Sequence, residues 1–169
     1  CALLLTLMCV ISAQYDKAIN DKPGYEYKDL LWTVLTGTDN SVHQGIMNDL
    51  KLIRGVLDVQ VSHTLPLESS SGNNVYMLDN GQENLFNIAD QYCGSAGLFE
   101  MLEIPFIEGR YPQNADEIAV SESFVKQMME FRDWSDGAVG KQVHITEHDE
   151  DHGAFTISGV YKDYRINTL

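Results

Sequence analysis

The densest group of side chains that could bind a metal or transfer protons is the run TEHDEDH at residues 146–152. On a helix, His148 and His152 would share one face, and imidazole with carboxylate groups is a ligand set for zinc and related ions. Gly153 and the strand-like residues on both sides favour instead the loop of a β-hairpin, where ligands would splay apart. We interpret the run as a solvated acidic loop, with a weak cation site as the alternative.

Other candidate residues fit packing better than chemistry. The stretch GAVGK at 137–141 holds a Gly-Lys pair, but a phosphate-binding loop needs Gly and Ser or Thr where this chain has Ser135 and Gln142. His63 falls on the apolar side of an alternating stretch and is predicted to be a core residue. Cys93 has no evident base partner in the sequence, and there is no GxSxG motif. We predict no catalytic, cofactor-binding or metal-binding residue, and therefore no enzyme and no cofactor.

The composition limits the class of partner. The chain has 25 acidic and 11 basic residues, a net charge of −14, and this charge repels nucleic acid and anionic lipid headgroups. With 169 residues and 44% hydrophobic content it can bury one core or two small subdomains. Its three cysteines have no CxxC spacing and indicate neither a zinc knuckle nor a redox pair.

The chain opens with an apolar run, residues 1–13, that carries no charge. Spanning a bilayer takes about 20 residues, so we favour the end of a transmembrane helix over a signal-peptide core or a buried helix. Tyr15, Tyr25 and Tyr27 follow, and they suit either an interfacial aromatic belt or an ordinary loop rich in tyrosine.

The patterns beyond this run predict a β-α-β unit. Residues 28–37 indicate a buried strand, and the clean alternation at 57–67 indicates a half-buried one. Between them, apolar residues with a 3.6-residue period predict a helix, with Asn40 or Ser41 as its cap and Gly55 near its end. If the two strands pair in parallel, these elements form one unit.

The middle of the chain is predicted to hold short strands separated by turns. The stretch SSSGNN at 69–74 indicates a turn before a strand at 75–78, and Asp-Asn-Gly at 79–81 indicates another. Alternating apolar residues between 86 and 92 predict a further strand.

The stretch 98–120 organises the second half of the chain. Ser95 is predicted to cap a short helix that ends before Pro105, because proline disfavours helical backbone in the residue before it. Gly109 and Pro112 then indicate a turn, after which the chain extends into a strand.

Beyond this stretch a helix and two strands are predicted. Ser121 or Ser123 would cap the helix, whose apolar positions are assigned to the core: 124, 128, 129 and 131. Strands follow at 143–145 and 155–161. The whole pattern predicts a mixed α/β fold without an internal repeat.

The order of these motifs resembles a known family. After the apolar helix come PGY at 23–25 and then the following stretches: LEI at 102–104, EGR at 108–110, DEIAVS at 116–121, residues 137–143, and FTISGV at 155–160. This order is similar to that of the periplasmic core domain of MacB-like, FtsX-related ABC transporter permeases, especially the form common in Bacteroides-like bacteria. The matching motifs are turns and core positions, so no substrate-contacting residue can be transferred.

The resemblance implies two small α/β subdomains, the second inserted into the first, lying in the periplasm and attached to the inner membrane. Residues 1–22 would be the end of a transmembrane helix with its linker. Residues 28–97 and 155–169 would form the base subdomain, and 98–154 the insertion. Family domains usually continue past the position of Leu169, so the base would be incomplete here.

The resemblance also implies a function and partners. The domain would be non-catalytic and would couple cytoplasmic ATP hydrolysis to motion outside the membrane. Its partners would be the cytoplasmic ABC ATPase, acting through the membrane helices, and a second permease copy or half. A periplasmic adaptor and an exported peptide or lipoprotein are further candidates. The alternative is a free-standing secreted or periplasmic binding protein with a signal-peptide remnant.

Overall fold

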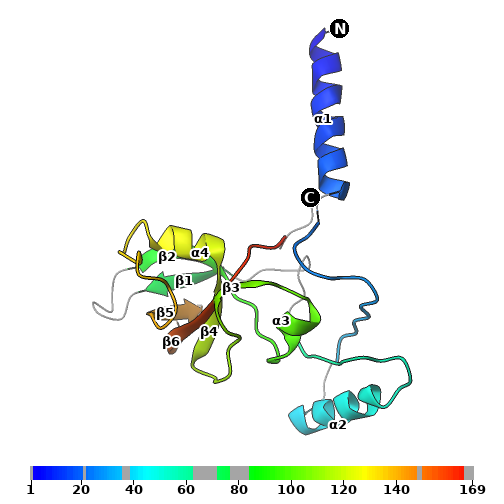
Figure 1. The fold of residues 1–169 in the computed structure, drawn as a ribbon, viewed down its shortest axis with the longest axis vertical. Coiled ribbons are helices and arrows are strands. Elements are labelled where there is room, and N and C mark those ends of the chain that lie inside the picture. The colour runs from blue at the N-terminus through cyan, green and yellow to red at the C-terminus, as the bar shows by residue number, and fades with distance from the viewer. Residues whose placement is uncertain are drawn as a thin grey trace.

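The computed structural model describes residues 2–20, 22–35, 39–62, 72–76, 84–147 and 150–165. Within these residues six strands form one mixed sheet in the order β2-β1-β5-β6-β3, with β4 pairing to β6 outside that path (Figure 1). The strands are β1 (Gly72–Tyr76), β2 (Asn84–Asp90), β3 (Phe106–Gly109), β4 (Glu117–Ser121), β5 (Gln142–Glu147) and β6 (Glu150–Tyr161). The prediction of a mixed α/β fold is confirmed.

Strand β6 pairs with three other strands of this sheet. It pairs antiparallel with β5 and β3, and in parallel with β4. The register places Ile118 of β4 beside Ile157 and Val143 of β5 beside Phe155. Apolar residues of neighbouring strands are thereby brought together, and one long strand joins the segments before and after it in sequence.

The core lies where helix α4 (Glu122–Met128) covers the sheet. Its buried residues are Val120, Met128, Trp134, Ala138, Val143, Ile145, Ile157 and Val160. Ser121 caps α4 as predicted, because its Oγ accepts a hydrogen bond of 3.1 Å from the Phe124 amide. The core assignment holds for Phe124 and Met128 but is wrong for Met129 and Phe131, which are exposed. The helix ends at Met128, so these two residues no longer follow its buried stripe.

Helix α3 (Leu98–Met101) ends in a motif that the sequence did not reveal. The Ile104 amide donates to the Phe99 carbonyl and the Glu103 amide to that of Glu100, both at 3.1 Å, while Glu103 adopts φ +50°. This is a Schellman motif, in which a left-handed residue stops the helix before Pro105 is reached.

The predicted Ser95 cap of α3 is wrong. The N-cap position is Gly97, and the Ser95 hydroxyl donates instead to Gln60 Oε1 at 2.6 Å. Ser95 thereby ties the coil before α3 to a distant coil rather than to its own helix.

The predicted helix in the first half is confirmed as α2 (Asn40–Lys51), although its N-cap is Asp39 and no side chain caps it. The strands predicted on both sides of it are wrong within the described residues: 28–35 and 57–61 form no strand, and Ser62 makes only an isolated bridge to Gly94. A strand requires the backbone of a neighbour, and no described strand runs beside these stretches. The β-α-β unit is therefore not formed there.

Most apolar residues of these two stretches are exposed, with Leu31 99% and Leu57 100% exposed, while Val59 is half-buried. The two patterns predict that these apolar side chains are buried. The continuation of the second pattern to residue 67, including His63, lies outside the described residues, as does the predicted turn at 79–81.

Helix α1 (Ala2–Asn20) stands away from the sheet (Figure 1), and its described side chains are exposed. No helix within the described part of the chain has both the length and the apolar character needed to cross a membrane.

Strands from both predicted subdomains share the one sheet. Strands β1 and β2 come from the proposed base, β3 to β5 from the proposed insertion, and β6 runs across the boundary between them. The division into base and insertion stays a prediction.

Candidate functional site: an aromatic junction between two ends of the domain

Two coils that are far apart in sequence meet beside the sheet. Residues 23–26 follow α1, and residues 162–165 follow β6. The coil after β6 runs toward the C-terminal end of α1 in Figure 1. The Arg165 amide donates to the Pro23 carbonyl at 2.6 Å. Gly24, at φ +91°, lies so close to Tyr164 that an added Cβ would stand 2.9 Å from the Tyr164 Cβ. Only glycine satisfies both the backbone angle and this close approach.

Aromatic rings continue this contact into the sheet. Tyr25 packs against Tyr164 with ring centroids 5.8 Å apart, and Tyr164 packs against Tyr161, at the end of β6, at 5.7 Å. The ring of Tyr161 then lies 5.3 Å from that of Phe99 in α3. Edge-to-face and offset pairs at these distances each add about 0.5–1.5 kcal/mol beyond the burial of their area. The rings form an uninterrupted row from the segment after α1 to the sheet.

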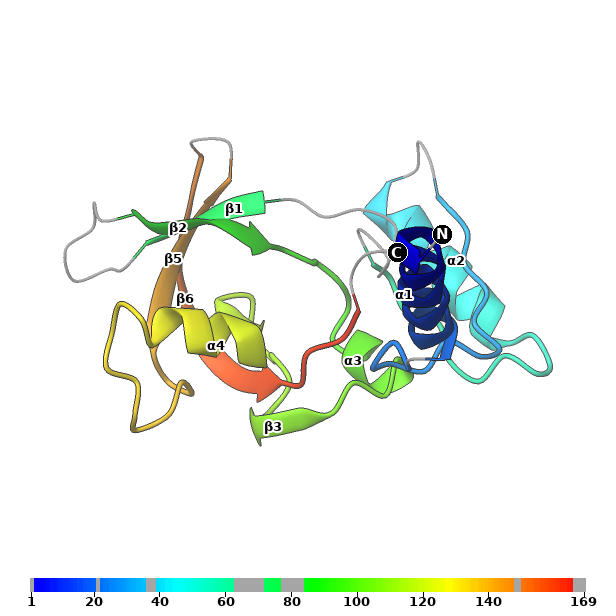
Figure 2. The ribbon, with the colours of Figure 1, turned by 90° about the horizontal axis from the view of Figure 1, so that it is seen from above.

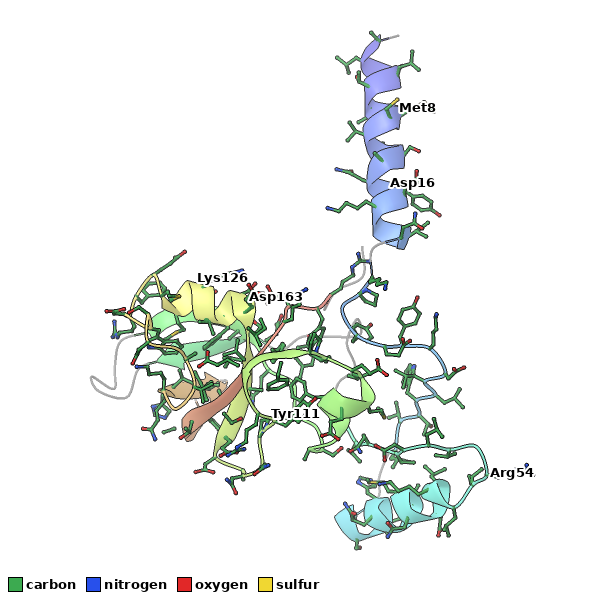
Figure 3. The ribbon with its side chains drawn as sticks, viewed as in Figure 1. Met8, Asp16, Arg54, Tyr111, Lys126 and Asp163 are labelled. Carbon is green, nitrogen blue, oxygen red and sulfur yellow. The ribbon has the colours of Figure 1, made fainter. Side chains whose placement is uncertain are left out.

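At the sheet end of the row, the ring of Phe99 contacts three other aromatic rings. Phe106 of β3 lies 5.2 Å and Tyr111 5.9 Å from it, centroid to centroid, and these two rings are 4.6 Å from each other. Figure 3 shows Tyr111 beside α3. We call this region the aromatic junction. It comprises residues 23–26, residues 162–165, and the side chains of Phe99, Phe106, Tyr111 and Tyr161.

Hydrogen bonds hold the same coils from other sides. The Glu26 amide donates to the Leu102 carbonyl at 2.8 Å, and the Lys162 amide to the Pro105 carbonyl at 2.9 Å. The Asp163 carboxylate accepts from the Ser123 amide at 2.9 Å and from its hydroxyl at 2.5 Å, at the start of α4 (Figure 3). The junction is therefore fastened to α3, to the linker before β3 and to α4.

Three tyrosines of the junction, Tyr25, Tyr161 and Tyr164, stay protonated at neutral pH. Burial raises the pKa of Tyr164 to about 12, and burial together with nearby Tyr164 and Asp163 raises the pKa of Tyr161 well above its usual range. Burial also raises the pKa of Tyr25, although the Arg165 guanidinium opposes the shift. A neutral phenol is a poor base and a poor nucleophile, and the rings of the junction are packed against one another.

The acidic run weighed as a metal site lies at the far end of β6 from the junction. Glu147 pairs with Glu150 across the antiparallel β5–β6 connection, which confirms the predicted hairpin. The predicted loop is too long, because residues 146–147 and 150–152 belong to the two strands. His148 and the side chain of His152 lie outside the described residues. The described part of the chain holds no group of three or more His, Cys, Asp or Glu arranged to bind a metal.

The other weighed residues lie elsewhere on the fold. In the 137–141 stretch the Gly140 amide donates to the Ile157 carbonyl at 2.8 Å, and Lys141 Nζ lies 2.8 Å from Asp136 Oδ2. The Gly140 amide and the lysine ammonium group are thus already engaged within the protein. Cys93 is exposed, and its Sγ accepts from Gln91 Nε2 at 3.7 Å.

Sequence reasoning did not find the junction. The sequence places Tyr25 in an interfacial belt or an ordinary loop rich in tyrosine, and nothing in it pairs this residue with Tyr164. The only local signal was Pro23-Gly24, which marked a turn without indicating what that turn packs against.

No protein-family model matches the sequence, and no curated protein matches it significantly. Among solved structures, the crystal structure of the periplasmic region of MacB from Actinobacillus actinomycetemcomitans matches with a TM-score of 0.50 and 18% sequence identity. The match covers 73% of this chain and 52% of that one, so this chain spans about half the length of the MacB region. At this identity the likeness establishes the fold. The resemblance to Bacteroides-like forms and to FtsX stays a prediction.

Proposed function

We propose that this chain is a non-catalytic, extracytoplasmic domain of an ABC transporter permease, located on the periplasmic side of the inner membrane. The fold shared with a MacB periplasmic region and the order of sequence motifs support this assignment. The observation that carries the mechanism is the aromatic junction, which connects the segment after α1 to the sheet.

The junction suits the transmission of movement. A flexible linker after α1 would absorb a displacement of that helix, whereas residues 23–26 are bonded to Arg165 and Leu102 and are packed against Tyr164. A shift of α1 would therefore be passed to the end of β6 and to α3 as one body. In the proposed transporter, ATP hydrolysis by a cytoplasmic ATPase moves the membrane helices, and the junction carries that motion to the periplasmic domain.

The remaining features of the proposal concern organisation and partners. We propose that residues 28–97 and 155–169 act as the base, with 98–154 inserted into it, and that a second permease copy supplies the facing domain. The junction would then lie where base and insertion meet, since it draws residues from both. An adaptor or an exported peptide or lipoprotein would be handled on the periplasmic side.

The test uses the intact transporter that contains this chain, reconstituted in vesicles. Tyr164→Ala should lower transport while ATP hydrolysis by the cytoplasmic subunit continues, because removing the ring loosens the link between α1 and the sheet. Tyr164→Phe keeps the ring and should retain transport. Phe131→Ala, an aromatic truncation outside the junction, is the matched control. Normal coupled transport in a correctly folded Tyr164→Ala variant would remove the mechanical role.

A second measurement addresses the absence of catalysis. The isolated chain should neither bind nor hydrolyse ATP, as measured by nucleotide titration and phosphate release. A disulfide between neighbouring periplasmic domains should reduce transport by restricting their motion, with recovery on reduction. Full transport by the disulfide-linked complex would make the domain a passive platform.

A further inference from the structure

A cavity of about 590 Å³ lies next to the aromatic junction, within the size range of ligand sites. It is bounded by β4, by the end of β2 with the coil that follows it, by α3 and by α4. In Figure 2 that coil leaves β2 and crosses to α3, opposite α4 and β6. Apolar side chains from three strands and α4 contribute to its wall: Ile118, Val120, Phe124, Ile145 and Phe155.

Strand β4 borders this cavity, and one of its two edges has no described strand beside it. Among the described strands β4 pairs with β6 alone, and that pairing occupies only one of its two edges. All five residues of β4 line the cavity. An unpaired strand edge presents backbone donors and acceptors in the spacing that another extended chain requires.

The charged residues that line the cavity determine which net charge a bound molecule should carry. Among the described residues, the charged ones that line the cavity are Asp90 and Glu117, and no described Lys, Arg or His lines it. Glu117 is neutralised by Arg110, whereas Asp90 contributes its charge within a chain whose net charge is −14. An anionic occupant would be repelled, and an uncharged or basic one would be attracted.

A buried hydroxyl group in the cavity wall favours a bound molecule that offers a hydrogen-bond acceptor. The Tyr92 hydroxyl is buried in the wall and has no hydrogen-bond partner among the described residues. Burial and the neighbouring Asp90 raise the pKa of this phenol, so the hydroxyl remains a donor at neutral pH. Leaving such a donor unpaired costs about 1–3 kcal/mol, a cost that an incoming carbonyl oxygen would remove.

We propose that this cavity binds an extended, apolar polypeptide segment of neutral or positive charge, which adds as a strand to the free edge of β4. Its side chains would enter the apolar wall, and one of its main-chain carbonyls would accept from Tyr92. This inference is independent of the transporter assignment, because it uses only the sheet edge, the cavity and its charge.

The experiment titrates the full chain with a synthetic acetyl-Lys-Val-Lys-Ile-Lys-Val-Lys-amide peptide and follows binding by calorimetry. Saturable binding is expected. N-methylation of alternate peptide amides, which removes main-chain donors while keeping the side chains, should weaken binding at least about tenfold, or 1.4 kcal/mol. The same peptide with Glu in place of Lys should not bind.

Protein variants separate strand addition from general charge attraction. Asp90→Lys should weaken binding of the basic peptide more than Glu130→Lys, which makes the same charge change away from the cavity. Tyr92→Phe should weaken it as well, without removing the ring from the wall. Amide exchange should slow at the β4 amides that do not bond to β6 when the peptide is bound.

Several results would overturn the proposal. These are equal affinity of the N-methylated peptide, absence of saturable binding at millimolar peptide, or equal effects of the two charge variants. If the β4 amides that do not bond to β6 are already protected in the free chain, another part of the chain or a second copy covers the edge, and the proposal fails.

Discussion

The ring of Tyr164 lies edge-on to the ring of Tyr25, with centroids 5.8 Å apart and planes inclined by 80°. This contact joins the coil after the last strand to the coil after the first helix. Tyr25 precedes all six described strands in sequence and Tyr164 follows them, so the contact brings together segments from both sides of the sheet sequence.

The first prediction concerns the stability of that contact. Tyr164→Ala should lower the free energy of unfolding by about 2–4 kcal/mol, toward the range for truncating a buried aromatic residue, because it interrupts the aromatic row and opens a void. Tyr15→Ala, on exposed α1, should change it by less than about 0.5 kcal/mol. Denaturant unfolding of the two variants gives both values, and equal effects would show that the ring contributes no packing.

The second prediction locates the start of the folded domain. A chain beginning after Asn20 should keep a cooperative thermal transition, since the described side chains of α1 are exposed. A chain beginning after Tyr27 should melt at a lower temperature, because it lacks Gly24 and Tyr25 and loses the bonds to Arg165 and Leu102. Circular dichroism melts compare the two. Loss of cooperativity in the first truncation would make α1 part of the core.

The third prediction compares two glycines with positive φ. An alanine Cβ at Gly109 (φ +71°) would collide with the Ser158 carbonyl oxygen and approach the Gly159 backbone, whereas at Gly140 (φ +85°) it would meet nothing within 4 Å. Gly140→Ala should therefore cost only the backbone strain, about 1–2 kcal/mol, and Gly109→Ala clearly more. Comparable losses in urea unfolding would mean that β3 can shift away from β6.

The fourth prediction tests the left-handed residue that ends α3. Glu103→Gly should stabilise the protein by up to about 1 kcal/mol, because glycine adopts φ +50° without the steric cost that a Cβ imposes. Glu103→Ala is the control, since it removes the same carboxylate but keeps the Cβ. Thermal melts should place only the glycine variant above the parent, and a gain shared by both would point to charge rather than backbone.

The fifth prediction uses the ion pair that closes the loop between β3 and β4. The Arg110 guanidinium, and secondly the Gln113 amide, lower the pKa of Glu117 from 4.5 to about 2. A lowered pKa in the folded state means that the ionised carboxylate favours folding. Its contribution is complete above pH 4.5 and is lost as the pH falls toward 2.

Glu117→Gln should remove that pH dependence. The melting temperature of the variant should lie below that of the parent at pH 7, and the gap should close between pH 4.5 and 2. Other carboxylates titrate in both proteins and cancel in the difference. A gap of constant size across this range would show that the ion pair contributes no pH-dependent stability.

The sequence by itself determined the elements whose signals are local. Ser121 caps α4 because a serine side chain reaches an amide three residues later in the same chain. The apolar alternation around Phe155 and Ile157 identified β6, although Gly153, which indicated the loop before it, lies inside the strand. These features follow from short-range geometry, so they are legible without the fold, as is the mixed α/β class that they build.

Only the tertiary structure decided the rest. The alternation at 57–67 predicted a strand, yet the described part forms none, because a strand exists only when a neighbour accepts its hydrogen bonds. Strand β3 was missed because it is short and its pairing to β6 defines it. Tyr25 meets Tyr164, and one edge of β4 has no described strand beside it, because of the position that β6 gives these segments. No local pattern encodes contacts between residues so far apart, and both the junction and the cavity consist of such contacts.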